Sequence, residues 1–398
     1  MTTVTALGTQ LQVATDSSFV NIVNTSDSGA YRITQQFTKD DLPYGVDLFA
    51  RVRHNGDPTG YSKWSPVVKF QVEIPSNVIG VCLDNTQTKG VFYWIDALGN
   101  KVENFDFHNH PTYAGITMAT IDGVTLTKFP KFYVRTLASG PANSFASGMK
   151  CWWISDIEEL GFHPAACFKR STIKSGNKYE ISDYCYMGTY LGHSETVRSK
   201  TCLGSKVNQT VLASTTKANF KTYINNRNDA SAGVSGFRMF DIWDLGALRM
   251  LLLIAKANSD TQTEWGDNSA GTSYPKTGST RARAVFKGTH DDIQVSMEDL
   301  WRCYWYHADL ITVNNGVVTL TSPMDLTSTL SFGSVSSSRY TQPTSSGWIR
   351  DVLDCPFTIG DDTHDLMELF LPASVVSVYS VSLRNRALTG TLPTLSYR

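Results

Sequence analysis

Short stretches of alternating hydrophobic and polar residues, separated by turn-forming residues, make up the N-terminal part of the chain. Residues 47–53 end in an Arg-Val-Arg alternation, which is typical of a strand with one buried face. Residues 55–60 are rich in Asn, Gly, Asp and Pro and predict a turn, and residues 67–72 predict the next strand. Strands that recur at intervals of about 8–12 residues, with no helical period, are typical of a small antiparallel sandwich. We therefore predict a small antiparallel β-sandwich for residues 1–75.

A proline-containing segment, residues 73–77, follows this region. Pro75 cannot donate a backbone hydrogen bond and it restricts Ile74, so the preceding strand is expected to end there. We predict a linker at these positions and a second, larger domain over residues 79–398.

Strand patterns continue in the larger region. The predicted strands are rich in aromatic and β-branched residues and span residues 91–96, 128–135, 151–155 and 182–190. Asp122-Gly123 lies between two apolar stretches and predicts a tight hairpin. Residues 310–398 again have the pattern of strands and turns.

Three segments of the same region have a helical pattern. Residues 239–257 have the strongest one, because their hydrophobic residues recur at three- and four-residue steps along one stripe. Residues 215–225 and 296–306 predict two further helices. The expected fold class is therefore mainly β, with an α+β C-terminal domain.

Composition narrows the class of protein. The chain has 398 residues and a formal net charge of -1, and 18% of its residues are charged. Soluble domains carry about 25% charged residues, so this chain is weakly charged. Aromatic residues at 11% exclude an intrinsically disordered chain. The charge balance gives no basic field for nucleic acid, and we expect no nucleic-acid partner.

The sequence shows no pattern for secretion or membrane insertion. Residues 1–10 lack the basic and apolar regions of a signal peptide. The most apolar stretch, residues 237–255, contains two arginines and two aspartates, so it is too charged to span a bilayer. We expect a protein that is synthesised in a cytoplasm and is not embedded in a membrane.

Cysteines are scattered along the chain and never spaced as CxxC. The seven are Cys82, Cys151, Cys167, Cys185, Cys202, Cys303 and Cys355. Without a secretion signal, we expect free, buried thiols made in a reducing compartment rather than a disulfide framework or a zinc site.

Three segments of the first domain resemble a known module. Leu42-Pro43, residues 49–53 and residues 60–66 resemble the last two strands of a fibronectin type III domain, although the tyrosine usual at the corner of that fold is absent. The resemblance implies that residues 1–75 form an immunoglobulin-like β-sandwich that serves as a spacer or virion-attachment module. Trp64 is expected to be a core or corner residue rather than a platform for a ligand.

The second domain resembles a domain common in bacteriophage tail-fibre and adhesin proteins. The segments that carry the resemblance are residues 129–133, 151–155, 161–165, 181–190 and 243–262. That domain is related to the formylglycine-generating (sulfatase-modifying) fold, which is a version of the C-type lectin fold. The resemblance covers residues 79–310 and implies a recognition domain. Fibre proteins of this kind are often trimers, so we expect a homo-oligomer.

Proteins of the resembling families carry out copper-dependent oxidation or calcium-dependent sugar binding, and each needs particular residues that can be sought in this sequence. Sulfatase-modifying oxidases bind copper through two cysteines, but Cys303 and Cys355 lie in aromatic or apolar settings whose spacing gives no sign that the sulfurs converge. Calcium-dependent lectins use a Glu/Gln-Pro-Asn/Asp tripeptide, and Gln342-Pro343-Thr344 lacks its third member.

Hydrolysis of a glycan would need two carboxylates about 5–9 Å apart, one with a raised pKa. The acidic clusters near residues 156–159 and 361–365 have the composition of solvated turns. We therefore expect no catalytic residue, no metal and no cofactor.

Two loops are rich in the residue types that dominate adaptable binding surfaces, namely Tyr, Trp, Ser and Gly. They span residues 261–284 and 331–348. The candidate receptor-binding residues in them are Trp265, Asp267, Asn268, Tyr274, Arg339, Tyr340, Gln342 and Trp348. The alternative is that these loops are solvent-facing turns packed by their own aromatic residues.

These expectations combine into one hypothesis and two alternatives. The first is a non-enzymatic virion protein, synthesised in the bacterial host cytoplasm, that serves as a tail-fibre or tail-tip adhesin. Its partners would be a bacterial surface receptor, either a glycan or an outer-membrane protein, and other tail proteins of the virion. The alternatives are a structural head or tail decoration protein and an oxidase of the sulfatase-modifying type.

Overall fold

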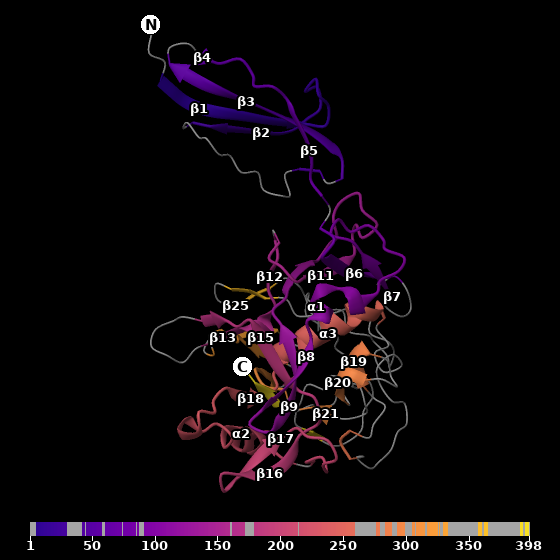
Figure 1. The fold of residues 1–398 in the computed structure, drawn as a ribbon, viewed down its shortest axis with the longest axis vertical. Helices are drawn as coiled ribbons and strands as arrows, with labels where there is room; N and C mark the ends of the chain where they lie inside the picture. Colours follow the sequence, from indigo (N-terminus) through magenta and orange to yellow (C-terminus); the bar gives the residue numbers. More distant parts are fainter. Residues whose placement is uncertain are drawn as a thin grey trace. The chain divides into compact units, whose positions relative to one another are not determined.

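The computed structural model divides into two compact units, Met1–Ser76 and Asn77–Arg398, here called unit 1 and unit 2 (Figure 1). The residues that the structure describes are 5–29, 42–43, 45–57, 60–73, 75–84, 86, 91–159, 161–171, 179–213, 215–258, 276–278, 283–288, 293–298, 305–306, 308–314, 317–324, 326, 329–332, 357–359, 362–364, 391–392 and 395–397.

Unit 1 is an antiparallel sheet of the order β2-β1-β3-β4, with β5 also paired to β3. Its strands are β1 (Thr5–Ala14), β2 (Ile22–Ser28), β3 (Asp47–Asp57), β4 (Gly60–Tyr61) and β5 (Val68–Gln71). The strands predicted over residues 47–53 and 67–72 are thus confirmed as β3 and β5. Among the described residues of this unit, the buried apolar side chains are few: Val13, Ala14, Phe19 and Leu48.

Alternating aromatic and arginine side chains stack on one another in unit 1. The Arg51 guanidinium lies 3.9 Å from the ring centre of Phe19 and 4.3 Å from that of Trp64. The Arg53 guanidinium lies 4.3 Å from Trp64 and 4.0 Å from Tyr61. Trp64 is therefore held between two arginines and is half-buried, which fits the role of a packed residue expected for it.

The segment after β4 continues along β3 through serine side chains. The Ser62 hydroxyl accepts a hydrogen bond from the His54 amide at 3.0 Å, and the Ser65 hydroxyl accepts one from the Val52 amide at 3.0 Å. The amides of the same serines donate to the His54 and Val52 carbonyls at 2.8 Å. This stretch thus satisfies backbone groups of β3 without being a regular strand.

Unit 2 is built on two five-stranded sheets, of the order β12-β10-β11-β6-β7 and β18-β28-β15-β9-β8. The strands of the first sheet are β6 (Val78–Asp84), β7 (Val91–Ile95), β10 (Tyr133–Leu137), β11 (Lys150–Ser155) and β12 (His163–Pro164). Those of the second are β8 (Thr117–Ile121), β9 (Val124–Pro130), β15 (Tyr184–Gly188), β18 (Phe237–Met239) and β28 (Leu395–Tyr397). Asp122 and Gly123 join β8 to β9 with positive φ angles of 48° and 74°, as predicted for a tight hairpin.

Smaller sheets complete the described part of unit 2. Their strands are β13 (Lys169–Ser171) with β14 (Tyr179–Ile181), β16 (His193–Val197) with β17 (Lys200–Gly204), β19 (Arg283–Gly288) with β20 (Ile293–Glu298), β21 (Trp305–Tyr306) with β27 (Thr391–Leu392), β22 (Ile311–Asn314) with β23 (Val317–Thr321) and β24 (Thr329–Phe332), and β25 (Phe357–Ile359) with β26 (Asp362–His364).

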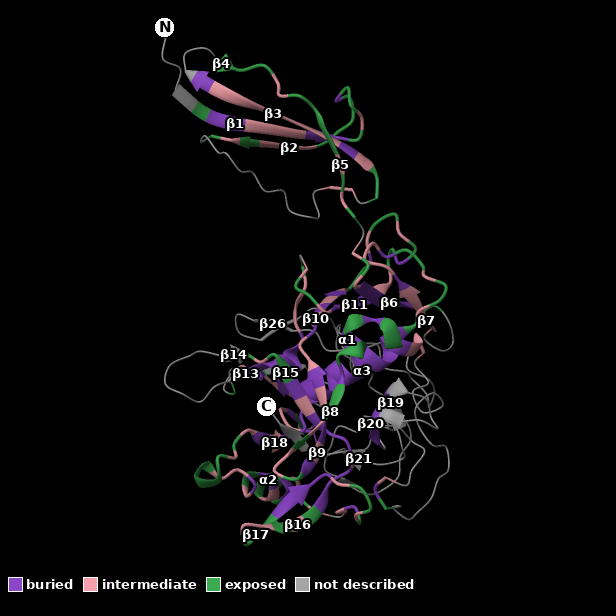
Figure 2. Ribbon diagram, viewed as in Figure 1, coloured by how far each residue is buried: buried purple, intermediate pink, exposed green. Residues whose placement is uncertain are grey.

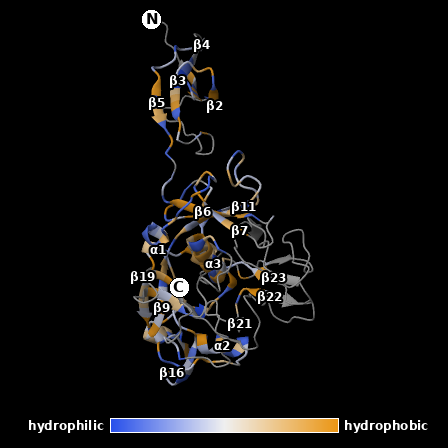
Figure 3. Ribbon diagram, turned by 90° about the vertical axis from the view of Figure 1, so that its right-hand side faces the viewer, coloured by the Kyte–Doolittle hydropathy of each residue, from blue (hydrophilic) through white to orange (hydrophobic). Residues whose placement is uncertain are grey.

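The helices among the described residues are α1 (Pro111–Ala114), α2 (Lys217–Asn225) and α3 (Ile242–Lys256), with short 3₁₀ turns at Phe107–Asn109, Ala166–Phe168 and Ala230–Ala232. α2 and α3 confirm the helices predicted over residues 215–225 and 239–257, and α3 starts later because residues 237–239 form β18. α3 is buried along almost its whole length (Figure 2). Its hydrophobic residues lie in the same region of the unit as those of β6 (Figure 3).

Two predicted elements are wrong. Residues 296–298 belong to β20 and residues 305–306 to β21, so the helix predicted over 296–306 does not form at either of its ends. The sequence of β20 alternates apolar and polar residues with a period of two, which favours pairing with β19. The single strand predicted over 128–135 is two strands, because β9 ends at Pro130, which cannot donate a ladder hydrogen bond.

The fold is thus mainly β with a few helices, and its larger core joins both sheets of unit 2 to α3. In the part of the chain that the structure describes, no helix is both long enough and apolar enough to cross a membrane. Five cysteines are described, and all five are free and buried, as predicted.

Candidate functional site

The loop residues predicted to bind a receptor lie outside the described residues. They are Trp265, Asp267, Asn268, Tyr274, Arg339, Tyr340, Gln342 and Trp348. Cys303 and Cys355, the cysteines compared with a copper site, lie outside them as well.

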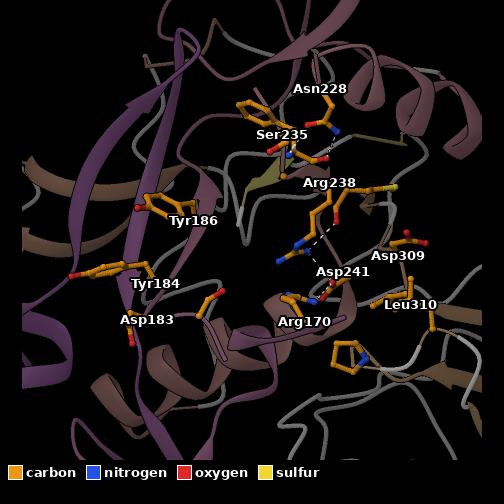
Figure 4. Close-up of a pocket in the computed structure, with 16 residues that line it drawn as sticks. Arg170, Asp183, Tyr184, Tyr186, Asn228, Ser235, Arg238, Asp241, Asp309 and Leu310 are labelled. Atoms are coloured by element: carbon orange, nitrogen blue, oxygen red, sulfur yellow. Dashed lines mark hydrogen bonds and ion pairs between the residues drawn. The ribbon is translucent and has the colours of Figure 1, made fainter. Parts of the chain in front are cut away.

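The described part of unit 2 contains an open cavity of ≈ 1010 Å³. Arg170 of β13, the strand β15, the residues on both sides of β18 and the segment before β22 surround it. Figure 4 shows Arg238 near the middle, between Tyr184 and Tyr186 on one side and Asp309 and Leu310 on the other. Segments that are far apart in the sequence therefore share one concave surface.

Two arginines and two aspartates form an ion-pair cluster beside the cavity. Arg170 Nη1 lies 2.8 Å from Asp241 Oδ2, and Arg170 Nη2 lies 2.7 Å from Asp244 Oδ1. Arg238 contacts the same two carboxylates, at 2.8 Å to Asp241 Oδ2 and 2.6 Å to Asp244 Oδ1. Figure 4 shows Arg170 and Arg238 beside Asp241. Arg170 and both aspartates are buried, whereas the Arg238 side chain retains 23% of its exposure.

The start of α3 holds the two aspartates of this cluster in place. Asp241 is the N-cap, and its Oδ1 accepts from the amides of Trp243 and Asp244 at 2.9 and 3.0 Å. Asp244 in turn accepts from the Asp241 amide at 3.1 Å, which completes a capping box. Helix initiation and ion pairing therefore use the same carboxylates.

Burial and the arginines act in opposite directions on these carboxylates. Burial, together with the neighbouring Asp244, raises the pKa of Asp241 against the attraction of Arg170. For Asp244 burial also opposes ionisation, but the attraction of Arg238 and Arg170 outweighs it, so the pKa of Asp244 is lowered.

The remaining charged groups that line the cavity are also paired. Asp183 lies 2.9 Å from the Lys131 ammonium. Asp309 lies 2.7 Å from the Lys221 ammonium and 3.4 Å from that of Lys217. Every described carboxylate and guanidinium of the cavity thus has a partner of opposite charge within the protein, and the cavity has little excess charge to offer a ligand.

An aromatic surface faces this neutralised cluster. On β15, Tyr184 and Tyr186 line the cavity while Cys185 between them is buried, as the alternation of a strand requires. Tyr184 retains 44% of its exposure, and the Lys128 ammonium lies 3.4 Å from the centre of its ring. Such a site offers ring faces and hydroxyl groups rather than net charge.

Metal and acid–base chemistry find little support in this geometry. Among the described residues, no group of three or more His, Cys, Asp or Glu side chains could hold a metal ion. The pKa of Asp241 is raised, but Asp241 and the neighbouring Asp244 are both ion-paired to Arg170 and Arg238, so the described cavity holds no unpaired carboxylate beside a raised one. The described lining is suited to contact a ligand through ring faces and hydroxyl groups.

A second charged cluster lies where the β8–β9 and β16–β17 hairpins meet the segment after α2. Arg227 is fully buried; its Nη1 lies 3.0 Å from Asp122 Oδ2, its Nη2 contacts Glu195, and its Nε donates to the Leu203 carbonyl at 2.8 Å. Arg198 binds Asp122 with both Nη atoms, at 2.9 and 3.0 Å. These contacts connect the β8–β9 turn to the β16–β17 hairpin and to the segment after α2, which indicates a structural role.

Burial disfavours the charged form of Glu195, but hydrogen bonds from His193 and Lys206 and the attraction of Arg227 outweigh it and lower the pKa of Glu195 to about 2. The charged form of this carboxylate is thus strongly favoured in the folded state.

Sequence reasoning missed Arg170, Arg238 and the role of the two aspartates. It treated Asp241 and Asp244 only as charges that interrupt an apolar stretch. Their spacing at the start of a helix was the available signal, because an N-cap and an acidic residue three positions later form a capping box. Charges inside so apolar a stretch also require buried partners.

Comparisons with known proteins add no relative. No protein-family model, no curated protein and no solved structure matches this chain.

Proposed function

We propose that this protein is a non-enzymatic phage virion protein, a tail-fibre or tail-tip adhesin that binds a bacterial surface receptor. In this proposal unit 1 is a fibronectin type III-like spacer or attachment module, and unit 2 is a C-type lectin-like recognition domain. The sequence resemblances in both units support the assignment. The protein would be synthesised in the host cytoplasm, reside in the tail as a homo-oligomer and contact other tail proteins.

The observation that carries the proposal is the open cavity with an aromatic face and internally paired charges. Ligand sites are usually concave and largely apolar, with a few polar groups that fix orientation. Tyrosines supply rigid area for apolar faces and a hydroxyl for hydrogen bonding. A sugar ring without charge matches this lining, because it presents C–H faces and hydroxyl groups and needs no counter-charge. We therefore favour a glycan over a protein as the receptor.

The test is adsorption of labelled, purified protein to host cells. We expect binding that competes with particle adsorption and that is lost on host mutants lacking one surface glycan. The variant Tyr184→Ala/Tyr186→Ala should weaken binding by about tenfold or more, since two aromatic contacts disappear. Phe145→Ala is the matched control, because Phe145 is an exposed aromatic residue of the same unit that does not line the cavity.

Salt gives a second readout. Because the charges of the cavity are paired, affinity should change little between low and high ionic strength. A steep loss of affinity in salt would point to an anionic receptor, and the absence of any binding to host cells would exclude the adhesin.

A second candidate function is that of a structural decoration protein that binds other virion proteins. It is favoured by the apolar side chains that unit 1 exposes, including Val20 at 78% and Val68 at 61%. Antibody labelling of particles distinguishes the two: label at the distal tip of the tail favours the adhesin, and label spread over the head or tube favours decoration.

A further inference from the structure

Two of the free thiols of unit 2 lie directly opposite each other on neighbouring strands. In the antiparallel pair β6–β11, Cys82 is the register partner of Cys151. Both side chains are fully buried, and both belong to one apolar cluster on the same face of the sheet. Directly opposed residues of an antiparallel pair have Cα atoms about 4.5–5.5 Å apart, which lies within the range of about 4.4–6.8 Å that a disulfide bridges.

We propose that Cys82 and Cys151 are a redox-sensitive staple, which a small disulfide oxidant closes into a cross-strand disulfide. One cysteine thiolate attacks a sulfur of the oxidant, forms a mixed disulfide and releases one small thiolate. The other cysteine thiolate then attacks the protein sulfur of this mixed disulfide, forms the Cys82–Cys151 bond and releases the second small thiolate. Two electrons pass from the cysteines to the oxidant, and the two released thiolates take up the two protons.

The surroundings allow this bond at small cost. The Cys151 thiol donates weak hydrogen bonds to the Met149 carbonyl at 3.3 Å and to the Ala146 carbonyl at 4.0 Å, and sulfur contacts of this kind are weaker than those of N–H or O–H donors. Burial raises the pKa of Cys82 to about 11, so the thiols react only when this part of the sheet opens. In a reducing compartment the pair therefore stays open, as the structure has it.

A second pair of thiols is less suited to oxidation. Cys167 and Cys185 are both buried, and the Cys185 sulfur lies 3.6 Å from Asp244 Oδ1. A thiolate there would face a buried carboxylate, and a disulfide would remove the contact of Cys185 with the ion-pair cluster. The geometry thus selects the cross-strand pair.

The staple would lie on the strand that follows the connection between the two units, so it would affect how unit 2 responds to mechanical tension. β6 is the first strand after the segment that connects the two units, so tension along the chain between the units reaches unit 2 through β6. A disulfide to β11 would hold this strand covalently to the centre of the sheet. The staple would make unit 2 resistant to pulling once the protein has met an oxidant.

The experiment is oxidation of the full, folded chain with oxidised glutathione, followed by alkylation of the remaining thiols and non-reducing peptide mapping. We expect one linked peptide that contains Cys82 and Cys151, a rise of several degrees in the melting temperature, and reversal by a reductant. Cys82→Ala should abolish the linkage, whereas Cys202→Ala, which removes another buried thiol, should leave it unchanged.

The denatured chain provides the reference. Oxidised without its fold, it should favour short loops such as Cys185–Cys202 over the loop of about 70 residues closed by Cys82–Cys151. If the folded chain gives those short-loop products, or gives no disulfide even in sub-denaturing urea, the staple does not exist. Because this readout uses the natural sequence, it holds even if a cysteine variant fails to fold.

Pulling single molecules by their two ends tests the mechanical consequence. The oxidised chain should release roughly 240 Å less length on complete unfolding than the reduced chain, because the residues between the two cysteines stay looped. Equal lengths after oxidation would contradict the proposal.

Discussion

Arginine side chains are held in different ways in the two units. In unit 1, Arg51 and Arg53 lie between aromatic rings in a half-buried stack. In unit 2, Arg170 and Arg227 are buried against carboxylates, with side-chain exposures of 8% and 0%. A partly exposed cation over a ring contributes about 0.5–1 kcal/mol, whereas removal of one member of a buried ion pair costs about 3–5 kcal/mol.

The stability of unit 2 therefore depends far more on each buried arginine than the stability of unit 1 depends on each stacked one. Loss of a stacked arginine leaves rings that can still pack or contact water. Loss of a buried arginine removes part of the counter-charge of carboxylates that are largely shielded from water. Substitutions of increasing exposure should therefore give a graded series of effects.

Arg227→Met should have the largest effect. It leaves Asp122 and Glu195 without their shared buried partner, and we expect the free energy of unfolding of unit 2 to fall by about 3–5 kcal/mol. Urea denaturation followed by tryptophan fluorescence reports mainly on this unit, because Trp64 is the only tryptophan of unit 1. Lys200→Met, at an exposed position of the β16–β17 hairpin, is the control. A loss below about 1 kcal/mol would remove the contrast between the units.

Acidification should weaken the same cluster by a somewhat smaller amount. The pKa of Glu195 is lowered from 4.5 to about 2, so its contribution is present above pH 4.5 and is lost as the pH falls toward 2. The corresponding free energy is up to about 3 kcal/mol. Denaturation of the protein and of Glu195→Gln at several pH values measures it. Their difference should be largest near neutral pH and vanish near pH 2, and a constant difference would contradict the assignment.

Arg51→Met should have a moderate and local effect. It removes contacts with the rings of Phe19 and Trp64 and hydrogen bonds to the Gln12 side chain at 3.0 and 2.7 Å. We expect a loss of about 1–2 kcal/mol in unit 1 alone. Hydrogen exchange should become faster in β1 and β3 and remain unchanged in unit 2. Faster exchange throughout the chain would show that the units are energetically coupled.

Lys69→Met should have the smallest effect. The Lys69 ammonium lies 2.6 Å from Asp47, but the two side chains retain 59% and 44% of their exposure. An exposed pair of this kind contributes about 0–1 kcal/mol, and high salt should abolish even that. A loss comparable with that of Arg227→Met would mean that exposure does not govern the series.

The sequence predicted those elements that depend on local patterns. The hydrophobic stripe of α3, the Asp122-Gly123 hairpin and the alternation in β3 each report a nearby cause, namely burial of one face or a backbone with positive φ. The helix predicted over residues 296–306 was wrong because the backbone of β20 is hydrogen-bonded to β19, and a pairing with another strand cannot be read from the local sequence.

The cavity could not be predicted from local sequence patterns, because segments far apart in the sequence line it. Its lining comes from Arg170, β15, β18 and Asp309, and only the topology brings these together. The sequence shows that Asp241 and Asp244 need buried partners, but it does not show which arginines supply them. Tyr184 and Tyr186 were recognisable as strand residues, yet the face they present depends on pairing with β9.

The place of β28 in the second sheet has a consequence for synthesis of the protein. Leu395–Tyr397 pair with both β15 and β18, so two strands made much earlier acquire their common neighbour only when the last described residues arrive. On a translating ribosome, this sheet therefore cannot close until residue 397 has left the exit tunnel. A polypeptide interrupted before that point would leave the edges of β15 and β18 that β28 covers unpaired. Chaperones and proteases recognise such exposed edges, so truncated copies would be removed preferentially.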